Sequence, residues 1–194
     1  MRAYRQECQQ GKRGRRPLDA VQLRDLALSY VARYATSAGK LERYLARKLA
    51  ERGWAEGEER PDIAALVARY VEAGYIDDAA YARMKASGLQ GRGYGARRVQ
   101  QTLAEAGVDQ ALRDEVTADH AARRHAALTM ARKRRFGPFA PLPPEREVRE
   151  KQLAAMLRAG HDLDMAREMV NAPSIAAAEE WAAALDGDGN DGAW

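Results

Sequence analysis

The stretch VQQTLAEAG (residues 99–107) places apolar side chains four residues apart and ends at a glycine, which is typical of a short helix with a glycine C-cap. Two other stretches, LARKLAERG (45–53) and QLAAMLRAG (152–160), align with it on their closing glycines. These glycines are 54 and 53 residues apart along the chain. Such near-constant spacing indicates an internal repeat. Since other helix signals flank each stretch, the sequence predicts three units of three short helices.

The composition favours helices along the whole chain. Of the 194 residues, 46% are hydrophobic, 31% are charged and only 7% are aromatic. Much of the chain is alanine, leucine, arginine and glutamate, which lose little conformational entropy in a helix. Valine and isoleucine are sparse and never alternate with polar residues over the length of a strand. We therefore expect an all-α fold, an elongated tandem repeat of three three-helix units.

Helix caps and glycine stops divide the chain into five segments. Residues 1–17 are expected to be a flexible basic N-terminal arm. Residues 18–75, 76–117 and 118–171 are expected to be the three repeats. Residues 172–194 are expected to hold an extra helix and an acidic tail rich in glycine and aspartate.

Particular residues mark individual helix ends. Ser37, Asp77 and Asp109 are expected N-caps, because their side-chain oxygens can accept hydrogen bonds from the free N–H groups of a first turn. The first helix is expected to begin at Pro17–Leu18, and the helix that follows Asp77 is expected to end near Gly88.

Charge is distributed unevenly along the chain. The formal net charge is +4, yet residues 1–54 hold 13 lysines and arginines against 5 acidic residues. Residues 171–194 hold no basic residue and five acidic ones. A basic front and an acidic tail favour a polyanionic partner, with the tail as an electrostatic mimic of it. The alternative is that these charges serve solubility alone.

Catalytic and metal chemistry are not expected. His120 and His125 are five residues apart, so the i, i+4 pairing of a helical zinc site is absent. The sequence contains no P-loop, no Rossmann glycine set and no nucleophile elbow. The adjacent Asp77 and Asp78 stand at a helix start, where capping explains them. We expect a protein that is not an enzyme and that uses no cofactor and no metal.

The remaining composition points to the cytoplasm. Cys8 is the only cysteine, which excludes an intrachain disulfide and favours a reducing compartment. No apolar run approaches the roughly 20 residues that a membrane span needs. The first 17 residues lack the apolar segment of a secretory signal. We expect a cytoplasmic protein without a membrane partner.

Basic side chains gather at the expected helices and give the candidate interaction surface. One group faces away from the leucine stripe of residues 41–49, a second surrounds RGYGARR (92–98), and a third ends the helix before residue 136. The candidate partner-binding or DNA-binding residues are Lys40, Arg43, Arg47, Lys48, Arg92, Tyr94, Arg97, Arg98, Arg123, Arg124, Arg132, Lys133, Arg134 and Arg135.

Arg97 and Arg98 stand in the first turn of a helix, where cations oppose the helix dipole. A sequence that accepts this small cost can use the free N–H groups and the guanidinium groups together to bind a phosphate or carboxylate. The alternative is a solvated basic face. Tyr94, between Gly93 and Gly95, is either a brace for the turn or an exposed contact.

The stretch GYIDDAAYARMKASGLQGRGYGARRVQQTLAEAGVD (74–109) resembles the central signature of RecX regulatory proteins. LERYLARKLAERGW (41–54) is similar to the first repeat of that family, and the resemblance covers roughly residues 18–170. Ala96 departs from the family, which usually has proline there. The third repeat has AGHDL around His161, where the family often has a basic residue and an aromatic residue.

The resemblance implies a non-catalytic regulator of the RecA recombinase. Such proteins lie in the helical groove of the RecA–DNA filament and restrain ATP hydrolysis, strand exchange, co-protease activity and filament growth. These activities belong to recombination, DNA repair and the SOS response. The implied partners are the RecA filament and, more weakly and without sequence preference, single- and double-stranded DNA, with the regulator acting as a monomer.

Two other functions remain open from the sequence. A plain helical DNA-binding protein could place the arginines of a helix N-terminus in a major groove, although RGYGARR offers mainly charge rather than side chains that read base edges. A helical scaffold without a nucleic-acid role is the third hypothesis.

Overall fold

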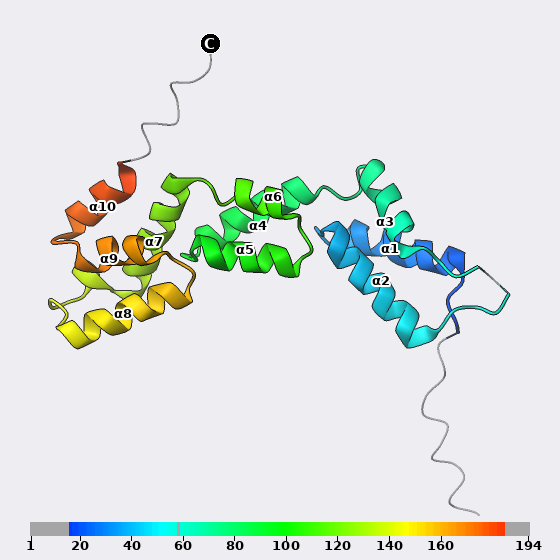
Figure 1. The fold of residues 1–194 in the computed structure, drawn as a ribbon, viewed down its shortest axis with the longest axis horizontal. Helices are drawn as coiled ribbons and strands as arrows, with labels where there is room; N and C mark the ends of the chain where they lie inside the picture. Colours follow the sequence, from blue (N-terminus) through cyan, green and yellow to red (C-terminus); the bar gives the residue numbers. More distant parts are fainter. Residues whose placement is uncertain (1–15, 58, 185–194) are drawn as a thin grey trace, which may run out of the picture. The chain divides into compact units, whose positions relative to one another are not determined.

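The computed structural model describes residues 16–57 and 59–184, and over these ranges the chain is helical without a strand (Figure 1). Most of the predicted basic arm, with Cys8, and the acidic tail from residue 185 lie outside the described residues. The prediction of an all-α fold built of three-helix units is confirmed. The helices of the first unit are α1 (Ala20–Arg33), α2 (Ala38–Arg52) and α3 (Ile63–Glu72).

The helices of the second unit include those of two repeats and one additional helix. They are α4 (Asp78–Gln90), α5 (Ala96–Glu105), α6 (Gln110–Glu115), α7 (His120–Arg134), α8 (Arg146–Arg158), α9 (Leu163–Asn171) and α10 (Ile175–Ala183), with a short 3-10 helix, η2 (Gly137–Phe139), before α8. The boundary between the two compact units falls after Asp77.

The first unit is held together by a leucine-rich core. α2 packs against both α1 and α3, and Leu23, Leu41, Leu45 and Leu66 are buried between them. Leu18 was expected to start the first helix, which is wrong. Leu18 is instead fully buried and lies in an extended segment. Its N–H donates to the carbonyl of Gly53 at 2.9 Å. Burial of its apolar side chain outweighs the weak helix signal at that position.

Caps fix most of the helix ends at the predicted residues. The Ser37 and Asp109 side chains accept hydrogen bonds from N–H groups in the first turns of α2 and α6. α2 ends at Gly53, which has a φ of 75°. The expected end of α4 near Gly88 is wrong, because the helix continues to Gln90 and buries Leu89. Gly88 has no positive φ and is tolerated inside the helix at a cost in entropy.

The second unit contains two adjoining cores. One lies among α4, α5 and α6 around Tyr81, Val99 and Leu103, and the other lies among α7, α8, α9 and α10 around Met156 and Met169. The proline-rich segment after α7 forms η2, where the N–H of Gly137 donates to the buried side-chain oxygen of Gln152 at 2.9 Å.

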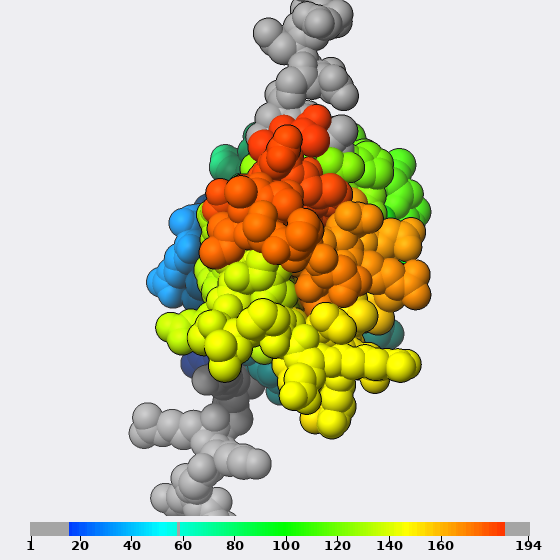
Figure 2. Space-filling model, turned by 90° about the vertical axis from the view of Figure 1, so that its left-hand side faces the viewer, coloured from blue at the N-terminus to red at the C-terminus, as the bar shows by residue number. Residues whose placement is uncertain are grey.

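α10 packs against α7 and covers part of its surface. The Arg124 guanidinium lies 4.6 Å from the ring centroid of Trp181 and donates to the Trp181 carbonyl at 2.8 Å. Arg132 forms an ion pair with Glu179. In the face that Figure 2 shows, α10 lies at the top in orange and red, and α8 lies at the bottom in yellow. α10 is therefore an additional helix that packs on α7 after the third repeat.

Candidate interaction surface

The RGYG turn at residues 92–95 packs against the turn that links α8 to α9. The N–H of Gly95 donates to the carbonyl of Ala159 at 3.0 Å, and the N–H of Arg97 donates to the carbonyl of Gly160 at 3.1 Å. N–H groups at the start of α5 thus bond to carbonyl groups at the end of α8. The turn joins the second repeat to the third, and this is the structural reason for its two glycines.

Glycine is required at this junction because the two backbones touch. A Cβ built on Gly95 would lie 2.3 Å from the carbonyl carbon of Gly160 and from the nitrogen of His161. Gly95 has a φ of −79°, which other residues adopt, so close approach alone selects glycine there. Gly93 and Gly160 have φ values of 92° and 93° and also lack room for a Cβ.

His161 completes the junction from the third repeat. Its side chain is 2% exposed, and Nε2 lies 3.0 Å from the carbonyl oxygen of Gly93. Because a carbonyl only accepts, Nε2 must carry the proton. Burial lowers the pKa of the His161 imidazole below its ordinary value, while the bond to Gly93 and the nearby Asp162 carboxylate oppose this shift. The buried ring is therefore best accommodated in its neutral form.

This burial makes stability depend on pH. Since the folded pKa of His161 lies below that of the unfolded chain, about 6.5, the unfolded state binds the proton more readily. The contribution is complete above about pH 6.5 and is lost as the pH falls through the folded pKa. We expect the thermal midpoint to fall from pH 7 to pH 5, and less steeply in His161→Gln.

The pH profile is measured by circular dichroism melts, with His120→Gln as the matched control because His120 is exposed at the start of α7. Identical pH slopes for wild type and His161→Gln would contradict the assignment of a buried neutral imidazole.

The predicted anion site at the start of α5 is wrong about two of its N–H groups, which are not free. The N–H groups of Gly95 and Arg97 already donate to the carbonyls of the third repeat. Asp162 lies beside them, paired with Arg123 and 3.8 Å from Nε of Arg97. Arg97 and Arg123 therefore support the junction, and these two N–H groups cannot also bind a phosphate.

Several of the other predicted basic residues of this unit support the fold, and most of them are also exposed. Arg124 and Arg132 hold α10, and Nζ of Lys133 lies 3.4 Å from the carbonyl of Arg92. The Arg92 guanidinium lies 5.9 Å from the ring centroid of Tyr94 and donates to the Gly88 carbonyl. The predicted residues with exposed side chains are Arg92, Tyr94, Arg97, Arg98, Arg132, Lys133, Arg134 and Arg135.

The predicted group on α2 lies in the first unit. Arg43 and Arg47 are exposed, while Lys40 and Lys48 are half-buried. Glu51 accepts from Nζ of Lys48 at 2.6 Å, and its other carboxylate oxygen lies 3.7 Å from Nε of Arg47. The predicted basic residues are therefore divided between the two units.

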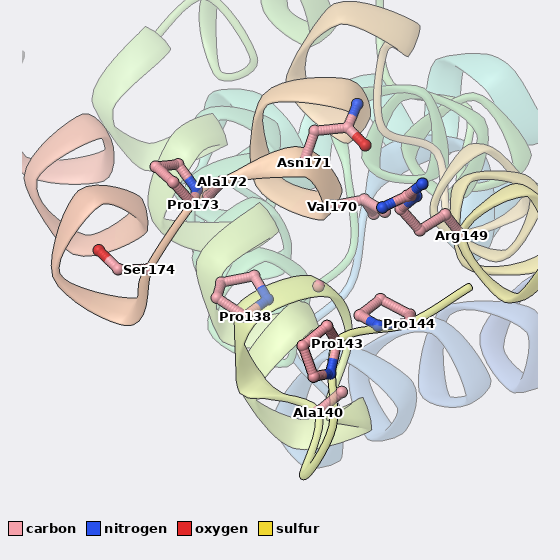
Figure 3. A pocket seen from close by; sticks show the side chains of 11 residues that line it. Pro138, Ala140, Pro143, Pro144, Arg149, Val170, Asn171, Ala172, Pro173 and Ser174 are labelled. Carbon is pink, nitrogen blue, oxygen red and sulfur yellow. The ribbon is translucent and has the colours of Figure 1, made fainter. Parts of the chain in front are cut away.

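The structure gives no sign of a metal site or a membrane span within residues 16–57 and 59–184. No group of three or more metal-ligating side chains comes together there, and no helix in those ranges is both long and apolar enough to cross a bilayer. A cleft of about 380 Å³ lies between η2 and the segment after α9 (Figure 3). Pro138, Pro143, Pro144 and Pro173 line it together with Arg149, and no constellation for catalysis is formed there.

Sequence relatives agree with this architecture. The chain is 34% identical over 171 residues to the "Regulatory protein RecX" of Myxococcus xanthus (strain DK1622), a match that covers 84% of this chain and 91% of that protein. The chain belongs to the RecX family. The predicted resemblance is thereby confirmed. A RecX protein of Halorhodospira halophila (strain DSM 244 / SL1) is 33% identical over 145 residues, which is 75% of this chain and 84% of that protein.

Two further comparisons concern the RecX repeats and fold. The family profile described as "RecX, second three-helix domain" matches residues 77–116, which hold α4 to α6. A crystal structure of a regulatory protein RecX superposes with a TM-score of 0.59 at 18% identity, over 77% of this chain and 70% of that one. At that identity the likeness shows the shared fold.

Both departures from the RecX signature are accommodated. Ala96, in place of the usual proline, is the first residue of α5. His161 lies in the third repeat and bonds to the RGYG turn of the second.

Sequence reasoning missed a group of tyrosines in this RecX chain. Tyr30, Tyr34 and Tyr44 meet on the first unit, next to Arg33 and Arg47. The spacing of Leu23, Tyr30 and Tyr34 in the sequence predicts that they share one face of the first helix. The sequence does hold a signal that Tyr34 is exposed, because it is the last residue of that stripe and stands at the end of the helix.

Proposed function

We propose that this protein binds the RecA–DNA filament in its helical groove and restrains its ATPase, strand exchange, co-protease activity and growth. The observation that carries the proposal is the extended likeness to proteins named regulatory protein RecX. Exposed Arg92 and Arg98 support it, since they flank the turn at the start of α5 and can face an acidic or phosphate-bearing surface.

Tandem repeats suit such a partner because a filament repeats its own surface. Weak contacts made by successive repeats to neighbouring protomers would reinforce one another through their covalent connection. Binding that favours one filament geometry opposes the changes that accompany nucleotide turnover. In this role the protein is a cytoplasmic, non-catalytic monomer without a cofactor. It functions in recombination, DNA repair and the SOS response.

ATP hydrolysis by the cognate RecA on single-stranded DNA, titrated with this protein, tests the proposal. We expect hydrolysis to fall to a small fraction of its starting rate as the protein approaches the filament concentration. The protein is added after filaments have formed, so that a direct effect on the filament is observed.

A second titration contains excess single-stranded DNA, because a protein that merely sequesters DNA would then lose its effect. Inhibition that persists supports filament binding. Unchanged hydrolysis together with binding to bare DNA would replace the proposal with that of a sequence-independent DNA-binding protein, whose affinity should fall steeply with salt.

A further inference from the structure

Three tyrosines form an ordered ladder on the surface of the first unit. The rings of Tyr30 and Tyr44 are stacked, with centroids 4.3 Å apart and an interplanar angle of 23°. The ring of Tyr34 lies 5.3 Å from that of Tyr30 at 51°. Tyr34 is the C-cap of α1, and its N–H donates to the carbonyl of Tyr30 at 3.1 Å. The backbone and the neighbouring ring therefore both hold Tyr34.

The outermost ring of the ladder is open to solvent. Tyr34 is 57% exposed, whereas Tyr30 and Tyr44 are half-buried against the core of the unit. Packing of α1 on α2 explains the two inner rings. It does not explain an aromatic ring that is held in position and left uncovered.

A groove of about 330 Å³ runs beside the ladder and carries positive charge. Its lining consists of the three tyrosines with Ser29, Arg33 and Arg47, so both charged residues are arginines. The Arg47 guanidinium lies 5.7 Å from the ring centroid of Tyr44. Its carboxylate neighbour Glu51 is 3.7 Å away and makes its shorter contact, 2.6 Å, with Lys48. Arg47 is 65% exposed, so it can turn toward a ligand.

Aromatic faces beside arginines match the two parts of an unpaired nucleotide. Any of the bases can stack on an aromatic ring, so this contact does not depend on the DNA sequence. Guanidinium groups pair with the flanking phosphates. Bases in a duplex have their faces covered by neighbouring base pairs and cannot use such a ring.

We propose that this groove binds single-stranded DNA, with one unpaired base stacked on Tyr34 and its flanking phosphates held by Arg33 and Arg47. This site lies outside the RGYG turn and its flanking arginines. Binding there needs no recombinase, so it extends the role proposed above and can be tested independently of it.

The test is binding of the full chain to a fluorescently labelled oligo(dT) in the absence of RecA, at fixed salt. Tyr34→Ala should weaken binding about five- to hundredfold, the range that loss of one base–aromatic stack produces. Tyr34→Phe keeps the ring and should bind as wild type does. Tyr75→Ala is the matched control, because Tyr75 is 60% exposed on the same unit and also packs beside another tyrosine, Tyr70.

Two altered strands identify what the ring binds. An abasic strand of equal length keeps the phosphates and should bind wild type and Tyr34→Ala equally weakly. A strand that carries 5-iododeoxyuridine should give a photo-crosslink to the peptide that contains Tyr34. Thermal midpoints confirm that each variant is folded.

Several results would overturn this site. Unchanged oligo(dT) affinity in Tyr34→Ala would do so, as would equal affinity of wild type for the abasic strand or for a duplex. Displacement of the strand by dTMP at the same nucleotide concentration would assign the groove to free nucleotides instead. If Tyr34→Ala kept its DNA affinity but lost inhibition of RecA, the ladder would be a protein contact. Failure to inhibit RecA, with the Tyr34 effect intact, would count only against the filament role.

Discussion

Replacing Gly95 by alanine should strongly destabilise the second unit. The added Cβ would lie 2.3 Å from backbone atoms of Gly160 and His161, and backbone cannot move aside as a flexible side chain can. The start of α5 and the turn after α8 would have to separate. That separation would break the bonds from Gly95 to Ala159 and from Arg97 to Gly160. We expect the free energy of unfolding to fall by about 3 kcal/mol, as for severe overpacking of a core.

Urea unfolding followed by circular dichroism measures this loss, with Gly88→Ala as the control. Gly88 lies within α4, has no positive φ and has nothing within 4 Å of a built Cβ. Alanine there should be neutral or should stabilise by about 0.5–1 kcal/mol, because it removes chain entropy from the unfolded state. If Gly95→Ala unfolded at the same urea concentration as wild type, the close contact between the two turns would be wrong.

The helices were predictable because their signals are local. Ser37 and Asp109 cap the helices that follow them, and Gly53 closes α2 as its position after a leucine stripe indicates. The same local reasoning failed at Leu18, whose burial depends on the backbone of Gly53. Periodicity indicates which face of a helix is apolar. It does not indicate which distant segment will bury a single residue such as Leu18.

The role of RGYG could not be derived from the sequence for the same reason. In the sequence, its glycines suggest a tight turn and its arginines suggest an anion site at the start of a helix, and both hypotheses concern neighbours along the chain. The contact that explains Gly95 is with Gly160, 65 residues later. His161 was recorded as a departure from the family, yet it bonds to the carbonyl of Gly93. Only the folded chain brings these residues together.

The tyrosine ladder illustrates a different limit. Spacing placed Tyr30 and Tyr34 on the apolar face of the first helix, which is correct for the half-buried Tyr30. Tyr34 follows the last helical residue, Arg33, and as the C-cap it has an extended backbone with φ −132° and ψ 126°, so its side chain is no longer on the helix face and is exposed. Whether the end of an apolar stripe is buried depends on where the helix ends, which the stripe itself does not show.

Charge reversal at Arg92 and Arg98 should abolish most of the proposed effect on RecA. Both side chains are exposed near the start of α5, and neither forms an ion pair among those found in the described residues. Arg92→Glu/Arg98→Glu changes the local charge by four units and turns attraction to an acidic or phosphate-bearing surface into repulsion. We expect the concentration that halves RecA ATP hydrolysis to rise at least about tenfold, with a smaller difference at high salt because exposed charges are screened.

Arg97 is left unchanged in this variant because its guanidinium lies 3.8 Å from Asp162, so its reversal would also disturb the junction. The matched control is Arg146→Glu, since the Arg146 side chain is 89% exposed on α8 of the same unit and, within the part of the chain that the structure describes, its ion pair is with Glu150 of its own helix. Arg146→Glu should inhibit as wild type does. Equal inhibition by both variants would remove the start of α5 from the binding surface. Equal loss in both would mean that the partner senses overall charge rather than the arginines beside the RGYG turn.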